Sequence, residues 1–189
     1  MCILNDGELE RRILLPDTDP QRIVFSPFDR AINLQPASLD MRLGRDLIIS
    51  NEGGDFVWNL ENCLAVLLPG RCVLATTYER LGVPADLSMQ MGGKSSIGRN
   101  FVIIHCTAGF HDPGFGITGG EPNESTLEIV NLSHKPFTLT YQMPICQAVF
   151  STLTAPAVRP YKGKYTNQRG GPAPDRTPAH AQQRLILDG

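Results

Sequence analysis

The sequence predicts one mainly β domain, a barrel or sandwich of short strands preceded by a short helix. Two observations lead to this prediction. From Pro16 to Pro160, runs of apolar and β-branched residues recur about every ten residues, separated by Gly, Pro, Asn and Asp. This rhythm is typical of barrels and sandwiches, and it differs from the alternation of strands and longer helices in parallel sheets. The 189 residues, 41% of them hydrophobic, are enough for one domain with a core.

The predicted helix occupies residues 3–14. Asn5 or Asp6 can cap it, because a short polar side chain accepts a hydrogen bond from an unpaired N–H of the first turn. Glu8 adds negative charge near the helix N-terminus, where the helix dipole favours it. Pro16 ends the helix. The apolar stripe comprises Leu9, Ile13 and Leu14.

Strand-like runs follow as far as residue 153. They span residues 46–50, 63–68, 71–77, 101–106, 125–132, 137–141 and 145–153. Residues 114–125 contain four glycines and a proline, so we expect a mobile loop there. The tail after Lys162 is rich in Gly, Pro, Gln and Arg, and only residues 184–187 suggest a further pairing. We therefore divide the chain into a β domain, residues 1–160, and a C-terminal segment, residues 161–189.

Composition excludes several classes of protein. A net charge of −2 argues against binding to long nucleic acids, which need an extended basic surface. Five cysteines without a CxxC pair argue against a disulfide framework or zinc ribbon and favour buried thiols in a reducing compartment. No apolar run reaches the roughly 20 residues that span a bilayer. The N-terminus also lacks a basic region followed by an apolar stretch. We therefore expect a cytoplasmic protein with no membrane partner.

The segment GGKSSIGR, residues 92–99, has the composition of a phosphate-binding turn. Backbone N–H groups, positive charge and hydroxyl groups all bind phosphate oxygens. The segment is not a Walker A loop, because Ser88 stands where that motif needs glycine and a strand-like run follows instead of a helix. A polar turn between strands is the alternative interpretation. The side chains suited to phosphate are Lys94, Ser95, Ser96 and Arg99.

The segment HCTAGFHDPGF, residues 105–115, contains two histidines that suggest a metal site at first sight. Only a turn at Ala108–Gly109 could bring His105 and His111 together, and no third ligand has a clear spacing. We therefore favour a structured turn that presents Asp112. Aspartate before Pro-Gly is also a common turn residue, so a purely structural role stays open.

The run TLEIVN, residues 126–131, places a carboxylate in a strand. Leu127 and Ile129 share one side, and Glu128 shares the other with Val130. A carboxylate on an apolar face is costly unless it is paired or used. Because desolvation raises the pKa of a carboxyl group, such a residue suits proton transfer near neutral pH. The alternative is a glutamate of an edge strand that faces water.

The segment AVRPYKGKYTNQRGG, residues 157–171, mixes basic and aromatic residues in the tail. Such a segment could clamp a polyphosphate, or it could be a solvated basic tail. Its basic and tyrosine residues are Arg159, Tyr161, Lys162, Lys164, Tyr165 and Arg169.

Taken together, these segments resemble the dCTP deaminase family, a branch of the trimeric dUTPase superfamily. The resemblance covers nearly the whole chain and begins at LQPASLDMRLG, residues 34–44. Each matching segment alone is a weak indication of the family, but the occurrence of all of them in this order is specific. The other matching pieces are residues 67–87, 94–99, 105–115, 126–131 and 157–170.

The resemblance implies a dUTPase-like distorted jelly roll that forms a homotrimer, with each active site at a subunit interface and Mg²⁺ on the nucleotide phosphates. Glu128 falls at the catalytic glutamate of the family. Ser95, Arg99 and the carbonyl of Ala108 fall at positions that support the attacking water, and Asp112 falls at the sugar-binding aspartate. The other positions implied to bind substrate are Lys94, Ser96, Phe110, Gln147, Tyr161, Lys164 and Gln168.

The chemistry of the residues agrees with deamination of dCTP without zinc. Attack of water on C4 of cytosine needs a base and then an acid, and one glutamate can serve as both in turn. The zinc-dependent solution needs an H-x-E motif with P-C-x-x-C. The nearest approach is Pro144–Cys146, after which no second cysteine follows.

KSSIGR and TAGFHDPGF are more similar to the subtype that also releases diphosphate and yields dUMP, the precursor of thymidylate, than to the dUTP-releasing subtype. In that subtype Asp112 would also help to activate water at the α-phosphate. Two features depart from the family. His111 stands where an aliphatic residue is usual, and the loop 116–125 is longer by about six residues. The rival interpretations are a plain dUTPase, a deaminase of a modified pyrimidine nucleotide, and a regulatory paralogue that binds nucleotide without catalysis.

Overall fold

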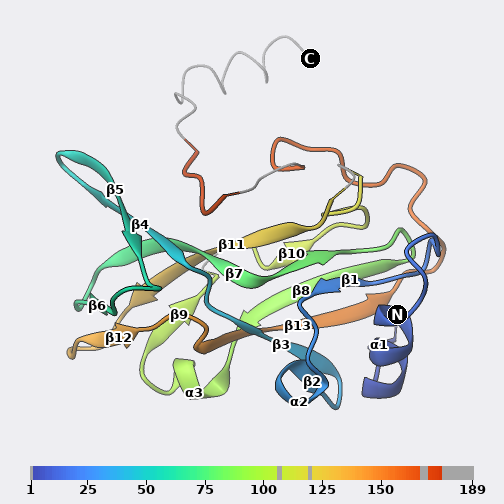
Figure 1. Ribbon diagram of the computed structural model, residues 1–189, viewed down its shortest axis with the longest axis horizontal. Helices are drawn as coiled ribbons and strands as arrows, with labels where there is room; N and C mark the ends of the chain where they lie inside the picture. Colours follow the sequence, from blue (N-terminus) through green and yellow to red (C-terminus); the bar gives the residue numbers. More distant parts are fainter. Residues whose placement is uncertain (1, 106–107, 119–120, 167–169, 176–189) are drawn as a thin grey trace, which may run out of the picture.

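The computed structural model describes residues 2–105, 108–118, 121–166 and 170–175. Two antiparallel sheets form a β sandwich, and a smaller pair of strands lies at one end (Figure 1). The first sheet has the order β5-β4-β7-β11-β9, and β1 also pairs with β7. Its strands are β1 Val24–Ser26, β4 Asp46–Asn51, β5 Gly54–Asn59, β7 Cys72–Gly82, β9 Val102–Ile104 and β11 Asn123–Asn131.

The second sheet has the order β10-β8-β13-β3-β2, and β12 pairs with β6 separately. Its strands are β2 Leu34–Gln35, β3 Ser38–Arg42, β8 Leu87–Gly93, β10 Phe110–His111 and β13 Pro144–Thr152. The separate pair comprises β6 Ala65–Leu67 and β12 Phe137–Leu139. The helices are α1 Asp6–Ile13, α2 Arg30–Asn33 and α3 Ser95–Gly98. The predicted mainly β fold with a short N-terminal helix is therefore confirmed.

One hydrophobic core lies between the two main sheets. It combines alternate residues from both, as expected when each strand turns one face inward. Phe150 of β13 and Leu127 of β11 are both fully buried in it. Further members from the two sheets are Leu39, Met41, Leu47, Val73, Ala75, Met89, Ile129 and Ala148.

The N-terminal helix begins as predicted but is shorter. Asn5 caps it, because its side chain accepts a hydrogen bond of 3.0 Å from the backbone N–H of Glu8. Leu9 and Ile13, one helical turn apart, are buried. The prediction that Leu14 belongs to the same stripe is wrong: it caps the helix end, a further 100° or so around the axis, and is 69% exposed.

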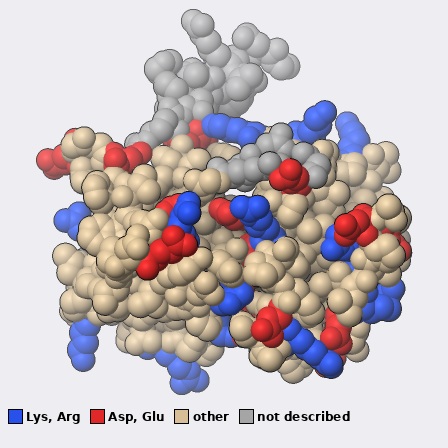
Figure 2. Space-filling view, in the orientation of Figure 1, with Lys and Arg blue, Asp and Glu red and all other residues tan. Residues whose placement is uncertain are grey.

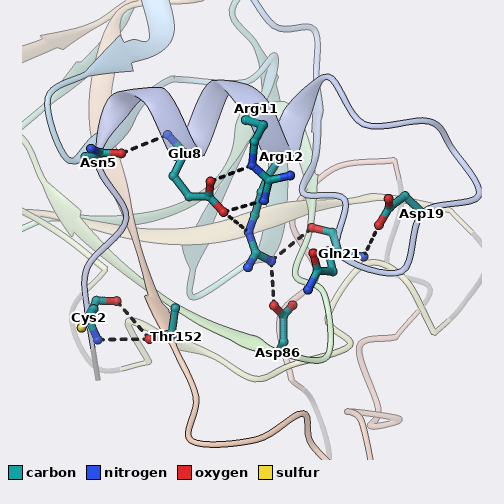
Figure 3. A network of polar contacts seen from close by, with 9 residues as sticks. All are labelled: Cys2, Asn5, Glu8, Arg11, Arg12, Asp19, Gln21, Asp86 and Thr152. Carbon is teal, nitrogen blue, oxygen red and sulfur yellow. Dashed lines mark hydrogen bonds and ion pairs between the residues drawn. The ribbon is translucent and has the colours of Figure 1, made fainter.

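Arg12 links α1 to the rest of the sandwich through hydrogen bonds and ion pairs (Figure 3). The guanidinium of Arg12 is nearly buried and donates to Glu8 at 2.9 Å and to Asp86 at 2.8 Å. Asp86 lies in the turn between β7 and β8, so this pair joins α1 to the second sheet. The same guanidinium also donates to the carbonyl of Gln21 at 3.3 Å.

The predicted strand-like runs all contain strands, but several strands were not predicted. These are β1, β2, β3, β5, β8 and β10, which are either very short or rich in Gly, Met and polar residues, so that their pattern is weak. The expectation of a loop throughout 114–125 is wrong at its end, because residues 123–125 already belong to β11, in which Asn123 and Glu124 pair with β7. The pairing expected at residues 184–187 lies outside the described residues.

Cysteine burial differs from the prediction. Cys146 is buried, and desolvation raises the pKa of its thiol, but Cys2, Cys63 and Cys72 are exposed. Cys106 lies outside the described residues. In the part of the chain that the structure describes, no helix has the length and hydrophobicity needed to cross a bilayer. Acidic and basic side chains are interspersed on the face shown in Figure 2, as the small net charge leads one to expect.

Candidate active site

A cavity of about 430 Å³ opens beside the outer face of β11. Along this strand Ser125, Leu127 and Ile129 are buried, whereas the alternate residues Glu124, Thr126 and Glu128 are partly exposed and line the cavity. The segment after Pro160 runs above β10 and β11 and closes one side (Figure 1). The remaining lining residues are Leu74, His105, Ala108, Phe110, His111, Asp112, Phe115, Tyr161, Tyr165, Ala173, Pro174 and Asp175.

Glu128 is held beside a histidine. His105 directly follows β9, and its backbone N–H donates to the carbonyl of Glu128 at 2.9 Å. Its Nδ1 lies 3.3 Å from Oε2 of Glu128. His105 has a φ of 63°, which is strained for a side chain larger than glycine and is typical of functional sites. The arrangement places a group that can carry a proton directly against the carboxylate.

The surroundings of Glu128 differ from the apolar face that the sequence predicted. Its side chain is 29% exposed, and its neighbours on the same face include Thr126 and Glu124. Leu132, which the alternation along the chain places on the same side as Glu128, is 58% exposed. The reason is that this side of β11 faces the cavity and not the core between the sheets. Glu128 can therefore meet both a ligand and His105.

The second histidine, His111, stacks on the first. The ring centroids of His105 and His111 are 5.7 Å apart with an angle of 27° between the planes. The fold thus brings together two histidines that are six residues apart in the sequence. Nε2 of His111 lies 3.0 Å from the hydroxyl of Ser125, and the edge of Phe115 packs against the ring. Groups of three or more possible metal-ligating residues do not occur among the described residues.

Burial makes His111 a weak base. Desolvation, and then the proximity of His105, lower the pKa of His111 from 6.5 to about 4, which the backbone of Gly109 offsets in part. Other titratable groups around the same cavity are Asp112 beside it, Glu124 and Glu128 on β11, and Tyr161 above. His111 is therefore a neutral ring at the pH of a cell.

This pKa predicts a stability change with pH. Between about pH 6.5 and pH 4 the unfolded chain binds a proton at His111 that the folded chain does not, so the free energy of unfolding falls as the pH falls. The loss amounts to about 3 kcal/mol. Urea unfolding of the wild type and of His111→Phe at a series of pH values measures it, because the other groups cancel in the difference. Parallel curves for the two proteins would contradict the prediction.

The predicted phosphate-binding residues lie away from this cavity. They belong to α3 and to the residues that cap its two ends, at the opposite edge of the molecule in Figure 1. Nε of Arg99 donates to the hydroxyl of Ser95 at 3.3 Å, and Ser96 is exposed. Lys94 forms an ion pair with Asp40 of β3. Within one chain, the structure thus separates Lys94, Ser95, Ser96 and Arg99 from Glu128.

A second hollow, of about 460 Å³, adjoins the first. Phe110 lines both, and it is 54% exposed. Gln147 of β13, which is expected to bind substrate, lines the second hollow and not the first. It lies close to Gly92, which it pairs with across β8 and β13.

One contact anchors the described part of the C-terminal segment to β11, and another joins two parts of that segment to each other. The amide of Asn123 donates to the carbonyls of Tyr165 and Thr166 at 3.0 and 3.1 Å. Asp175 lies 2.5 Å from Nζ of Lys164 and accepts a hydrogen bond from the hydroxyl of Tyr165 at 3.2 Å. Tyr161, also expected to bind substrate, lines the main cavity. Gln168 lies outside the described residues.

Sequence reasoning thus identified much of the cavity but missed some of its residues. Ala108, Phe110, Asp112, Glu128 and Tyr161 are brought together as lining residues. The sequence singles out His105 only as a possible metal ligand and His111 also as a departure from the family, and it predicts neither the contact of His105 with Glu128 nor that of His111 with Ser125. Their contacts depend on the register of β9 against β11, in which Ile104 pairs with Ile129 and so places His105 next to Glu128.

Comparisons with known proteins agree with this architecture. Residues 3–153 match the dCTP deaminase-like family. The chain is 39% identical over 189 residues to a protein of Halobacterium salinarum called dCTP deaminase, dUMP-forming, with coverage of 89% of this chain and 91% of that protein. A Mycolicibacterium smegmatis protein of the same name is 37% identical over 194 residues, covering 93% and 96% respectively.

A Haloarcula marismortui protein called dCTP deaminase is 34% identical over 198 residues, covering 89% of this chain and 91% of that protein. Among solved structures, the 2'-deoxycytidine 5'-triphosphate deaminase of Agrobacterium tumefaciens superposes with a TM-score of 0.59 and 24% identity. This superposition covers 78% of this chain but only 46% of that chain, and it supports the fold alone. The match over residues 3–153 and the identities to the curated relatives show that the chain belongs to the dCTP deaminase-like family.

Proposed function

We propose that this protein deaminates dCTP without zinc and also releases diphosphate, so that its product is dUMP. The observation that carries the proposal is Glu128, a carboxylate in a pocket of nucleoside size, 3.3 Å from His105 and beside Ala108 and Asp112. The names of the H. salinarum and M. smegmatis relatives support the dUMP-forming reaction.

In the proposed reaction Glu128 removes a proton from a water molecule, and the water oxygen attacks C4 of the cytosine ring. The carboxyl group then delivers this proton to N3. The carboxylate next takes the proton of the new C4 hydroxyl group and passes it to the amino group, and the C–N bond breaks as ammonia leaves and the C4 carbonyl forms. The carbonyl of Ala108 would accept a hydrogen bond from the attacking water. Asp112, which lines the same cavity, would bind the sugar and assist the attack of water on the α-phosphate.

We also propose that the protein is a homotrimer in which Lys94, Ser95, Ser96 and Arg99 complete the cavity of a neighbouring subunit. The separation of these residues from Glu128 within one chain supports this arrangement. Ser95, Ser96 and Arg99 are exposed and so are accessible to a neighbour. The neighbour's hydroxyl and guanidinium groups would then bind phosphate and steady the attacking water, while Tyr161, Lys164, Gln168 and Gln147 of the catalytic subunit enclose the nucleotide.

Mg²⁺ would accompany the nucleotide, held mainly by its phosphate oxygens. The charges around the phosphate-binding residues suit such a cation: Lys94 is paired with Asp40, and Lys164 is paired with Asp175. Each lysine is thus largely neutralised, so a triphosphate would need further positive charge. A divalent cation that prefers oxygen ligands supplies that charge and draws the phosphates together.

A product assay tests the function. Purified protein is incubated with dCTP or dUTP and Mg²⁺, and the products are separated by chromatography while ammonia is measured. We expect ammonia, diphosphate and dUMP from dCTP, unchanged after exhaustive treatment with a zinc chelator. Absence of ammonia would disprove deamination. Accumulation of dUTP would disprove the dUMP-forming reaction, and activity on dUTP alone would indicate a plain dUTPase.

Subunit complementation tests the shared site. Arg99→Ala and Glu128→Gln should each be nearly inactive, but co-refolded in equal amounts they should regain about a quarter of wild-type activity, because a mixed trimer has one site with both intact residues. The control pairs Arg99→Ala with Ser95→Ala, two changes in the same segment, and should stay inactive. Failure of the first mixture, with trimers verified by light scattering, would place all these residues in one subunit.

A further inference from the structure

The two departures from the family, His111 and the enlarged loop 116–125, meet in the structure. Ser125 is the last residue of that segment, where the structure already forms β11, and its hydroxyl lies 3.0 Å from Nε2 of His111. Both residues are nearly inaccessible, with 7% of His111 and 1% of Ser125 exposed. Burying an imidazole is costly unless it is hydrogen-bonded, so this contact explains how the chain tolerates a histidine at this place.

Ser125 is itself held firmly. The pairing of β11 with β7 shifts in register between Glu124 and Thr126, where the single residue Ser125 lies opposite three residues of β7, Thr77–Glu79. Its backbone N–H donates to the hydroxyl of Thr77 at 3.0 Å, and that hydroxyl donates to the carbonyl of Glu79 at 2.7 Å. The side chain of Ser125 is therefore fixed by its place in β11 and by this contact with the irregular part of β7.

From Ser125 a continuous line of contacts leads to Glu128. The ring of His111 stacks on that of His105, and Nδ1 of His105 faces Oε2 of Glu128. The backbone of His105 is strained, so it needs support to stay in place. The ring of His111 also contacts Phe115 in an edge-to-face arrangement, with ring centroids 4.7 Å apart, and Phe115 lies beside Tyr161.

We infer that His111 is a positioning residue for Glu128: anchored on Ser125, its neutral ring holds His105 against the carboxylate that acts on the substrate. An aliphatic residue at this position could fill the space but could not be oriented by a hydrogen bond. The enlarged loop thereby contributes to the catalytic geometry through its last residue. The catalytic role of Glu128 in this inference rests on the proposed function. The way in which Glu128 is held in place rests on the contacts alone.

The kinetic test removes the hydrogen bond and keeps the ring. Ser125→Ala should lower kcat for dCTP about tenfold while KM changes less than about twofold, because the bond orients Glu128 without binding the nucleotide. Ser125→Thr, which keeps the hydroxyl, should restore most of the rate. Ser88→Ala, the same change at a buried serine of β8, is the matched control. A rise in KM at constant kcat, or no change at all, would overturn the inference.

A second readout needs no activity. Introduced into the otherwise wild-type protein, Glu128→Gln should shift the imidazole ¹⁵N resonances of His105. The same substitution should cause a smaller shift in a protein that already carries Ser125→Ala or His111→Phe. An equal shift in all backgrounds would overturn the positioning role. If the wild type released no ammonia but the shift behaved as expected, the proposed function would fail and the positioning role would stand. If the wild type released ammonia but the shift were equal in all backgrounds, the proposed function would stand and the positioning role would fail.

Discussion

Replacing Glu128 with glutamine is expected to lower the rate of dCTP deamination on the order of 10³-fold, since general acid–base catalysis contributes about 10²–10⁴-fold. The amide has nearly the same shape as the carboxylate but cannot take a proton from water and return it. Binding of dCTP should change little, because the pocket keeps its form. Steady-state release of ammonia measures the rate, and calorimetric titration with dCTP measures the binding.

The matched control for this variant is Glu124→Gln. Glu124 lies on the same face of β11 and lines the same cavity, but it is engaged with Arg80 at 3.5 Å instead of with a histidine. It should lose less than about tenfold in rate, as a substitution outside the proton-transfer step. Turnover by Glu128→Gln at a rate close to that of the wild type would show that another group is the base.

Replacing Arg42 with methionine is expected to destabilise the folded chain by about 3–5 kcal/mol. Glu79 is fully buried, and both its oxygens depend on this partner: the backbone N–H and Nε of Arg42 each donate to it at 2.7 Å. The amide of Asn33 adds a third bond of 3.1 Å. Removal of the guanidinium leaves a carboxylate in the core without a countercharge, which is the costly half of breaking a buried ion pair.

A double-mutant cycle tests this explanation. Arg42→Met combined with Glu79→Leu removes both charges, and it should recover most of the lost stability. Urea unfolding at one fixed protein concentration is required, because the association of subunits that we propose would contribute to apparent stability. If the double variant were no more stable than Arg42→Met, the loss would come from packing and not from the isolated charge.

The strands that the sequence predicted well are those with an unmistakable local pattern. β7, β11 and β13 carry runs of apolar and β-branched residues and appear at the expected places. β8, LSMQMGG, was missed because Met and Gly favour strands weakly, and its place in the sheet depends on pairing with β13. The helix cap at Asn5 was predictable because capping is a contact within four residues.

The same distinction applies to the candidate site: local patterns select some of its residues but do not reveal what surrounds them. Glu128 could be selected from its strand and Asp112 from its turn, and both line the cavity. The assumption that Glu128 faces an apolar surface was wrong, because alternation in a strand shows that two sides differ but not what each side meets. The catalytic roles assigned to Ser95, Arg99 and Ala108 stay predictions that complementation and kinetics can test.

By itself, the sequence determined the fold class, the family and the residue types available for chemistry, because each follows from local patterns and ordered motifs. Only the tertiary structure decided which of them meet. It placed His105 against Glu128, joined His111 to Ser125, and set the loop containing Lys94 and Arg99 apart from the cavity. These contacts depend on strand register and on the packing of segments distant along the chain, which no local pattern encodes.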